Sequence, residues 1–529
     1  MRQLNAHDAN LLHSDNSHAN ANLSLIQIYD QSTAPGGKVR FKSILAHIES
    51  RLAGLPIFRS KLQRVPFDLD HPYWVDDDNF DIEYHVRHIA LPKPGDWRQF
   101  CIQASRIHAR ALDMSRPLWE IYVIEGLDSL LELPEGSFAL LTKVHNAAID
   151  AESGARIARL LHDTTPHAPA PAPPQPWFAR SAPGSIALLA RGALNAVRSP
   201  LQPRTPLARR LVDSASAAAT FATDLLLHPD QVLATCFNSV VSAHRVFDTR
   251  RFMLDEFKAI RGLVEGATVN DAVLAVCGGA LRRYLASLGE LPASSLSAAT
   301  PIYVRAGKPD GALTLSWLRI LLGTELDDAV QRLALIQSQT AEAKASGQAL
   351  GARELTDVQQ QSASATLALS SRMQGLSSQA GLRRPPTAAC TVTNVPGPSV
   401  PMYLLGARMS YFSAIMPISD GMGLVFAVTS YDGRIVISPT SCRELIPDPE
   451  AFTQHLRDSF QEYLAMAQAA ATAMPATKKA GRAPAAPRSA RPRVSAPGAP
   501  APKRRSVRKA ATAPRAVPAG RPRRATPAG

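Results

Sequence analysis

The alternation of apolar and polar residues is clearest between Ser137 and Leu161, SFALLTKVHNAAIDAESGARIARLL. Residues 138–144 follow a period of two, which predicts a buried β-strand. The strand leads through a loop at 145–150 into a segment with helical spacing of apolar residues. A histidine and an aspartate close together at the end of a strand are the outline of an acid–base site.

The same periodicities predict the elements of the rest of the chain. Apolar residues at helical spacing predict helices over 39–55, 97–111, 327–345 and 449–466. A period of two predicts strands over 23–29 and again after residue 387, where Asp432-Gly433 predicts a two-residue hairpin. Asn270 is placed as the N-cap of a further helix. The Gly278-Gly279 pair inside that helix predicts close approach of a neighbouring element.

A Pro/Ala-rich stretch, TTPHAPAPAPPQP, separates two α/β halves of the chain. Periodicity alone therefore predicts two α/β domains. The predicted division is an N-terminal domain with the active-site loop, a linker with crossover helices, a C-terminal domain and a tail, at 1–163, 164–230, 231–468 and 469–529. The helices between Ser185 and Leu227 either lie on an anionic membrane or pack as a crossover between the domains.

The positive charge of the chain is concentrated at its end. The net charge is +14, yet Pro475–Gly529 carries 15 Lys or Arg and no Asp or Glu, so the preceding 474 residues carry −1. A segment of Ala, Pro, Lys and Arg has little to bury and is predicted to be disordered. We expect it to bind anionic membranes without sequence preference, with non-specific nucleic acid binding as the alternative. It has no aromatic residues that could stack on bases.

The cysteine pattern and the hydropathy favour an intracellular protein. Five cysteines are scattered and never spaced as C-x-x-C, which predicts neither a zinc or other metal site nor a disulfide framework. No secretory signal is apparent, and no run of about 18 apolar residues could span a bilayer. The expected location is the cytoplasm, peripheral to the inner membrane or to lipid inclusions.

Three further segments carry a family resemblance, in this order: LDMSRPLWEIYVIEGL at 112–127, TVNDAVLA at 268–275 and TVTNVPGP at 391–398. Together with the loop at 145–150 they resemble the bacterial wax ester synthase/acyl-CoA:diacylglycerol acyltransferase family over roughly residues 1–466. The resemblance implies two chloramphenicol-acetyltransferase-like α/β domains with the active-site loop between them. It also implies acyl-CoA as donor substrate, diacylglycerol or a long-chain alcohol as acceptor, and no cofactor.

The chain departs from the family's active-site motif, His-His-x-x-x-Asp-Gly, at two positions. Counting back from Asp150, Asn146 stands where the family has its second His, the general base, and Ala151 replaces the Gly. An asparagine can donate or accept a hydrogen bond but cannot take a proton. We expect His145 to face away from the channel unless a bulge turns it inward. Asp150 is interpreted as structural, paired with an arginine.

The resemblance also assigns roles to residues outside the loop. It places Pro117, Leu118 and Trp119 at the acyl-binding side of the channel, with core packing as the alternative for Trp119. Five further positions match family motifs and are interpreted as architectural: Asn270, Asp271, Asn394, Pro396 and Gly397.

Three functions remain possible at this point. The first is an O-acyltransferase that uses acyl-CoA, with Asn146 in place of the general base. The second is an inactive relative that binds lipid or acyl-CoA at a lipid surface. The third is a polyanion-binding protein that acts through its tail.

Overall fold

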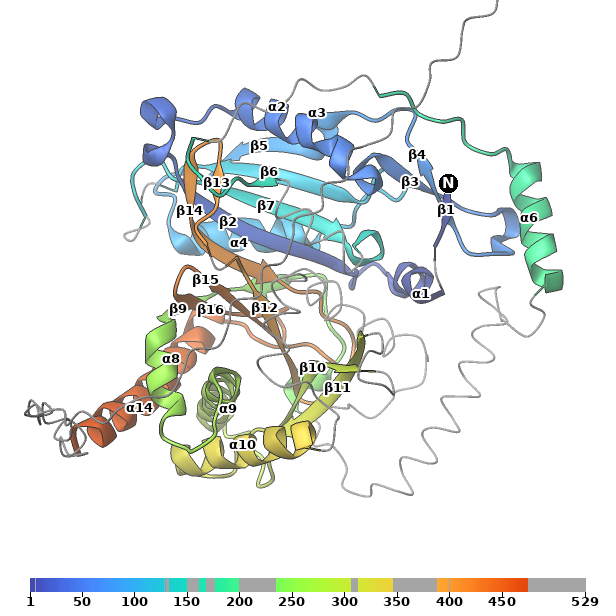
Figure 1. Cartoon of the computed structure of the whole chain (residues 1–529). Helices are drawn as coiled ribbons and strands as arrows, with labels where there is room; N and C mark the ends of the chain where they lie inside the picture. The colour runs from blue at the N-terminus through green and yellow to red at the C-terminus, as the bar shows by residue number, and fades with distance from the viewer. Residues whose placement is uncertain are drawn as a thin grey trace, which may run out of the picture. The chain divides into compact units, whose positions relative to one another are not determined.

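The computed structural model contains two large β-sheets (Figure 1). It describes residues 1–4, 6–127, 129, 133–149, 161–167, 177–198, 235–305, 313–345, 388–398 and 400–473. The first sheet has the strand order β13-β14-β2-β7-β6-β5. Its strands are β2 (Asn22–Asp30), β5 (Val86–Ala90), β6 (Trp119–Glu125), β7 (Phe138–His145), β13 (Tyr403–Leu404) and β14 (Ala407–Ile415).

The second sheet has the order β11-β10-β12-β15-β16-β8, and β9 also pairs with β16. Its strands are β8 (Arg245–Phe247), β9 (Arg250–Met253), β10 (Ser297–Arg305), β11 (Leu313–Leu321), β12 (Cys390–Pro396), β15 (Val425–Tyr431) and β16 (Arg434–Cys442). A small third sheet contains β1 (Arg2–Gln3), β3 (Ser60–Gln63) and β4 (Tyr73–Asp76).

Helices pack on the large sheets and on the small one. They are α1 (Ala6–Ser14), α2 (Phe41–Arg51), α3 (Ile82–His85), α4 (Trp97–Ala109), α6 (Ser185–Arg198), α8 (Leu254–Arg261), α9 (Val269–Ser287), α10 (Ala329–Ala345) and α14 (Pro449–Ala473). The helices predicted over 39–55, 97–111, 327–345 and 449–466 correspond to α2, α4, α10 and α14. The strand predicted over 23–29 is β2.

The central strand β7 is buried on both faces, as its period of two predicts. Phe138, Leu140 and Val144 lie in the core that α2 covers. Ala139 and Leu141 lie in a second core that α4 covers on the opposite face (Figure 1). The strand therefore ends between two packed layers, and the position of the loop that follows it is set by both.

The first sheet is completed by strands from the C-terminal half. β14 pairs antiparallel with β2, with Ala414 opposite Leu25. The predicted N-terminal domain, 1–163, thus supplies only four of the six strands of its own sheet. Residues Met1–Met474 form one compact unit. The predicted tail, 469–529, lies outside the described residues except for 469–473, which belong to α14.

The start of α9 corrects one prediction. Thr268, not Asn270, is the N-cap, and its side chain accepts a hydrogen bond from the Asp271 backbone N–H. The Asp271 carboxylate in turn accepts a hydrogen bond from the Thr268 backbone N–H at 2.8 Å. Both threonine and asparagine suit an N-cap, but this reciprocal capping box forms only in the Thr268 register.

The predicted close approach at the glycine pair is confirmed. A Cβ on Gly278 would lie 2.9 Å from the carbonyl oxygen of Leu322. A Cβ on Gly279 would collide with the Ser459 hydroxyl of α14. The hairpin at Asp432-Gly433 is also confirmed, and both residues have positive φ, as a type I′ turn requires.

A buried lysine lies two residues before the end of β7. The Lys143 side chain is fully buried, and its Nζ donates to the carbonyl oxygen of Ile107 on α4 at 3.0 Å. It also pairs with Glu120 at 3.5 Å. Burial lowers the pKa of Lys143 from 10.5 to about 8, against the attraction of Glu120.

This depressed pKa gives a pH dependence with a definite sign. Between pH 8 and 10.5 the unfolded chain holds a proton on Lys143 that the folded chain lacks, so the free energy of unfolding rises with pH. The expected slope from this group is about 1.4 kcal/mol per pH unit. In urea titrations across this range, the free energy of unfolding of wild type minus that of Lys143→Met should rise with this slope, and the same difference taken for Lys258→Met, an exposed control, should stay flat. Parallel pH profiles for wild type and Lys143→Met would contradict the assignment.

Candidate active site

Backbone hydrogen bonds hold the end of β7 on both sides. The His145 N–H donates to the carbonyl oxygen of Leu118, and the Asn146 N–H donates to that of Ala21, each at 3.0 Å. In the sheet, His145 lies opposite Asn22, the first residue of β2. The loop at 145–150 therefore begins at a fixed point between β6 and β2.

His145 is buried and both of its ring nitrogens are engaged. Its Nδ1 accepts a hydrogen bond from the Ala147 N–H at 3.1 Å. This contact places the proton on Nε2, which donates to the Asp15 carboxylate at 3.1 Å. Neither nitrogen is free to take a proton from a substrate in this arrangement. His145 holds the turn that presents the next residue.

Asp15 was not identified from the sequence. It follows α1, and its second carboxylate oxygen accepts from the Ala21 N–H at 2.8 Å. One carboxylate thus ties the residue before β2 to the residue that ends β7. Asp15 and His145 are 130 positions apart in the chain. The polar N-terminal segment has no periodic pattern of apolar residues from which this contact could have been predicted.

Asn146 begins a short 3₁₀ turn, η6 (Asn146–Ala148), and is fully buried. Among the described residues, neither its amide nitrogen nor its amide oxygen has a hydrogen-bond partner. Leaving a buried amide unpaired costs about 1–3 kcal/mol. Asp150 and Ala151 lie outside the described residues.

The segment Pro117–Trp119 lies next to His145 and belongs to the core. Leu118 supplies the carbonyl that holds His145. Trp119 is buried between the rings of Phe58 and His85, at centroid distances of 4.7 and 4.5 Å. Its indole N–H donates to the carbonyl oxygen of Phe58 at 2.8 Å. These contacts favour core packing over substrate contact for Trp119.

Asp271 and Asn270 join elements around the second sheet. The Asp271 carboxylate accepts from the Thr340 hydroxyl of α10 at 2.9 Å. The Asn270 side chain accepts from the Asn394 amide of β12. Among the described residues, none of these side chains hydrogen-bonds to His145 or Asn146, and the contacts they make are architectural.

The end of β12 makes a close contact with β15. Pro396 lies opposite Ser430 in the sheet, and the next N–H, of Gly397, donates to the Ser430 carbonyl at 2.7 Å. A Cβ on Gly397 would collide with that same carbonyl. This position thus requires glycine.

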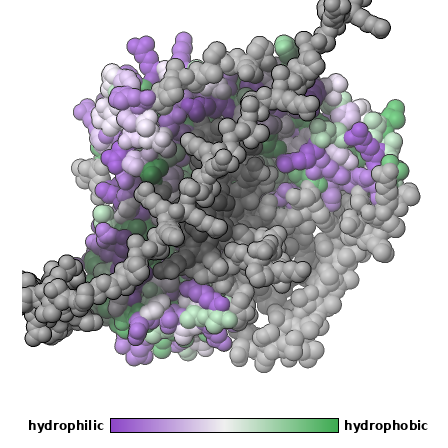
Figure 2. Space-filling model, viewed as in Figure 1, coloured by the Kyte–Doolittle hydropathy of each residue, from purple (hydrophilic) through white to green (hydrophobic). Residues whose placement is uncertain are grey.

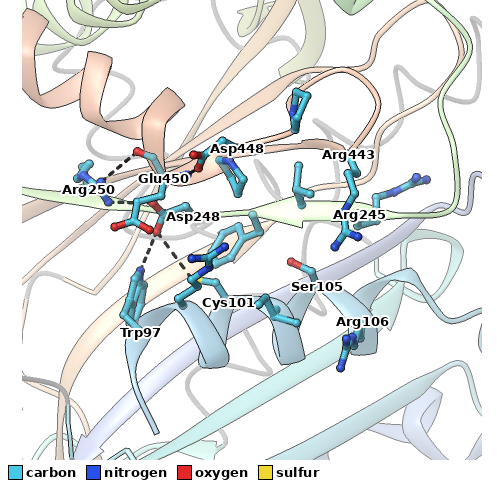
Figure 3. Close-up of a pocket in the computed structure, with 16 residues that line it drawn as sticks. Trp97, Cys101, Ser105, Arg106, Arg245, Asp248, Arg250, Arg443, Asp448 and Glu450 are labelled. Atoms are coloured by element: carbon cyan, nitrogen blue, oxygen red, sulfur yellow. Dashed lines mark hydrogen bonds and ion pairs between the residues drawn. The ribbon is translucent and has the colours of Figure 1, made fainter. Parts of the chain in front are cut away.

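A cavity of about 510 Å³ lies between α4 and the residues around β8 (Figure 3). At one end of this cavity the buried side chain of Asp248 accepts several hydrogen bonds. It accepts from the Trp97 indole and from Arg250, each at 2.8 Å, and from the Thr453 hydroxyl of α14. Within the described ranges, no group of three or more His, Cys, Asp or Glu could hold a metal ion.

Comparisons with known proteins place both halves of the chain in one family. Residues 4–273 match the wax ester synthase/diacylglycerol acyltransferase catalytic domain. Residues 314–463 match the C-terminal domain of the same family.

Individual relatives agree with this match. A putative diacylglycerol O-acyltransferase of Mycobacterium tuberculosis is 30% identical over 472 residues, covering 88% of this chain and 90% of the relative. The solved wax ester synthase/diacylglycerol acyltransferase of Marinobacter aquaeolei superposes with a TM-score of 0.61, at 24% identity, over 88% of this chain and 100% of that one. The starter condensation domain of rhizomide synthetase superposes with a TM-score of 0.50, at 12% identity, over 88% and 94%. The fold is therefore the two-domain α/β fold that condensation domains share.

The Asp15–His145 contact can be tested by a double-mutant cycle. Asp15→Asn or His145→Gln leaves a buried polar atom unpaired, and each should lower the free energy of unfolding by about 1–3 kcal/mol. The double variant should be less destabilised than the sum, with a coupling energy within about 0.5–3 kcal/mol by chemical denaturation. Strictly additive losses would show that the two side chains do not depend on each other.

Proposed function

The chain belongs to the wax ester synthase/diacylglycerol acyltransferase family, and we propose that it transfers a fatty acyl group from acyl-CoA to diacylglycerol or a long-chain alcohol. The observation that carries the proposal is Asn146, a buried amide without a partner among the described residues, which directly follows the anchored His145.

The reaction joins the acceptor oxygen to the thioester carbonyl carbon and breaks the carbon–sulfur bond. The hydroxyl proton finally resides on the CoA thiol. The Asn146 amide oxygen can accept a hydrogen bond from the acceptor hydroxyl, and its N–H can donate to the thioester carbonyl oxygen. Asn146 is thus a positioning and polarising group, and the proton leaves without passing through an imidazole.

This assignment predicts the effect of restoring the base. General-base catalysis is worth about 10²–10⁴ in rate, so Asn146→His should raise turnover by a factor in that range. The assay is thin-layer separation of triacylglycerol and wax ester made from labelled acyl-CoA with each acceptor. Asn146→Ala, which removes the amide, should fall below wild type.

Two results would count against the proposal. An unchanged rate in a well-folded Asn146→His variant would remove Asn146 from the base position. Binding of acyl-CoA by wild type and Asn146→His without any product would instead favour the inactive, lipid-binding relative.

We also propose that the protein works at an anionic lipid surface. Among the described helices, none is long and apolar enough to cross a membrane. Helix α6 has one buried face, where Leu188 packs on Val65 and Tyr73. On the opposite face Ile186, Ala190 and Ala193 recur at helical spacing, and all three are exposed.

More apolar side chains are exposed in the same part of the chain. Phe67 belongs to the 3₁₀ turn η5 (Pro66–Asp68), which α6 contacts. Its φ of +59° is a conformation rarely adopted by residues other than glycine, and the ring is 84% exposed. Phe178, shortly before α6, is exposed to the same degree. Figure 2 shows hydrophobic residues beside hydrophilic ones at the place of α6.

Such a surface suits the boundary between lipid head groups and acyl chains. Arg191 of α6 is exposed beside the apolar face, and the 15 cations of Pro475–Gly529 add attraction to anionic lipid. We refer to Ile186, Ala190 and Ala193 as the α6 surface.

The lipid proposal predicts which change weakens sedimentation with anionic liposomes. Ile186→Asp places a charge in the α6 surface and should reduce binding severalfold at low and high salt. Val240→Asp, at an exposed site elsewhere, should bind as wild type does. Deletion of Pro475–Gly529 should reduce binding at low salt only, because that contribution is electrostatic. Wild-type binding by both Ile186→Asp and the deletion would contradict the proposal.

A further inference from the structure

The loop between α1 and β2, residues 15–21, holds both residues at the end of β7. At its start, the Asp15 carboxylate accepts a hydrogen bond from His145. At its end, the carbonyl oxygen of Ala21 accepts from the Asn146 N–H. The Ala21 N–H also donates to Asp15, so the two ends of the loop are joined to each other. We call this segment the 15–21 loop.

The middle of the 15–21 loop is a tight, hydrogen-bonded turn. The Asn16 side-chain oxygen accepts from the N–H groups of His18 and Ala19, at 2.9 and 2.6 Å. The Asn16 N–H donates to the carbonyl oxygen of Ala19 at 2.8 Å. The Asn20 side chain donates to the carbonyl oxygen of Ala109 on α4 at 3.0 Å. Such local hydrogen bonds stiffen a segment that has no regular secondary structure, so a displacement of its tip is passed to its base.

The tip of the 15–21 loop is held by the C-terminal half, residues 235–473. The carbonyl oxygen of His18 accepts a hydrogen bond from the Arg245 guanidinium at 2.7 Å. The His18 Nε2 lies 3.3 Å from the Asp420 carboxylate, which also accepts from the Val241 N–H at 2.9 Å. Among the hydrogen bonds of the described residues, those of His18 are the sole ones between the loop and the C-terminal half. One residue of the loop therefore carries this connection.

Arg245 is the buried member of the contact. It is the first residue of β8, lies opposite Cys442 in the sheet and is 7% exposed. Its guanidinium also donates to the carbonyl oxygen of Ser242, in the turn before β8. Burial lowers the pKa of Arg245 from 12.5 to about 10, against the attraction of Asp420 and Glu444. The group is therefore charged at neutral pH, and charge-assisted hydrogen bonds to two carbonyls offset the cost of burying it.

We propose that Arg245 is a positioning residue for acyl transfer, which acts through the 15–21 loop on His145 and Asn146. The inference rests on the proposed function, in which the Asn146 amide contacts the reacting groups. Arg245 fixes the tip of the loop, the Asn16 turn stiffens its middle, and Asp15 fixes the ring of His145. A displacement of about 1 Å at a reacting group can cost about a hundredfold in rate. The C-terminal half thus contributes to the geometry of a site on the first sheet.

The orientation of His145 can be measured without activity, by NMR of the full-length protein labelled with ¹⁵N at histidine. The Nε2 proton of His145 is bound to Asp15 in a buried site and should exchange slowly with water. Loss of the signal in His145→Gln assigns it. Arg245→Met fills a similar space without either donor, so it should shift the signal and speed the exchange by about tenfold or more. An unchanged signal in Arg245→Met would overturn the proposal.

Two further variants separate positioning from stability. Arg332→Gln is the matched control, because Arg332 is buried and donates to the carbonyl oxygens of Leu326 and Asp327 within the C-terminal half. It should melt below wild type and leave the His145 signal unchanged, and a shifted signal would reduce the effect of Arg245 to general destabilisation. Asn16→Ala opens the turn at an exposed position, where folding does not depend on a buried charge. It should also shift the signal, and no shift would overturn transmission through the loop.

Kinetics test whether this positioning matters to acyl transfer. Arg245→Met and His145→Gln should each lower kcat by about tenfold or more and change KM for acyl-CoA by less than about threefold. Because both act on the same loop, the double variant should be no slower than His145→Gln alone. Multiplied losses would show that Arg245 acts by another route. A raised KM with kcat retained would make Arg245, which lines the 510 Å³ cavity, a substrate contact and would also overturn the proposal (Figure 3).

The two readouts distinguish failure of this inference from failure of the proposed function. A wild type that makes no ester, but whose His145 signal depends on Arg245, would refute the transferase and uphold the connection. An Arg245→Met variant that forms ester with the kcat of wild type would refute the positioning role and leave the transferase intact.

Discussion

The hydrogen bond from His145 to the Asp15 carboxylate is the constraint on which the active-site loop depends. It fixes the ring of His145, and the same carboxylate holds the chain just before β2. Because the Ala147 N–H occupies the other ring nitrogen, the imidazole has a defined tautomer and no free lone pair. A histidine that sequence alone could read as catalytic is thus part of the scaffold, and the residue it presents is Asn146.

This arrangement changes how the transfer can be catalysed. A general base removes the acceptor proton as the new bond forms, whereas the Asn146 amide can only orient the hydroxyl and polarise the carbonyl. Positioning of two bound substrates still lowers the barrier substantially, because it replaces an encounter in solution. If Asn146 stands at the base position, as we propose, binding and orientation carry most of the rate enhancement.

Local patterns predicted local structure well. The period of two located β7 and β2, the helical spacing located α2, α4, α10 and α14, and Asp432-Gly433 predicted its hairpin. These signals depend on residues that are close in the sequence. The N-cap of α9 was placed two residues late, because both Thr268 and Asn270 can cap a helix and only the contact with Asp271 decides between them.

Contacts between residues that are far apart in the sequence could not be predicted from local patterns. A period of two predicts β14 as a strand but does not say that it joins β2, nearly 400 residues earlier. Likewise, no local pattern links Asp15 to His145. Such contacts follow from the packing of whole sheets, so they emerge only when the fold is complete.

The pH dependence of wild-type turnover tests the central claim most directly. If the acceptor proton leaves without an imidazole base, log kcat for ester formation should show no inflection between pH 5.5 and 7.5, about one unit to either side of the ordinary pKa of histidine. An inflection near pH 6.5 that disappears in His145→Gln would show that His145 is the base, and would contradict the account.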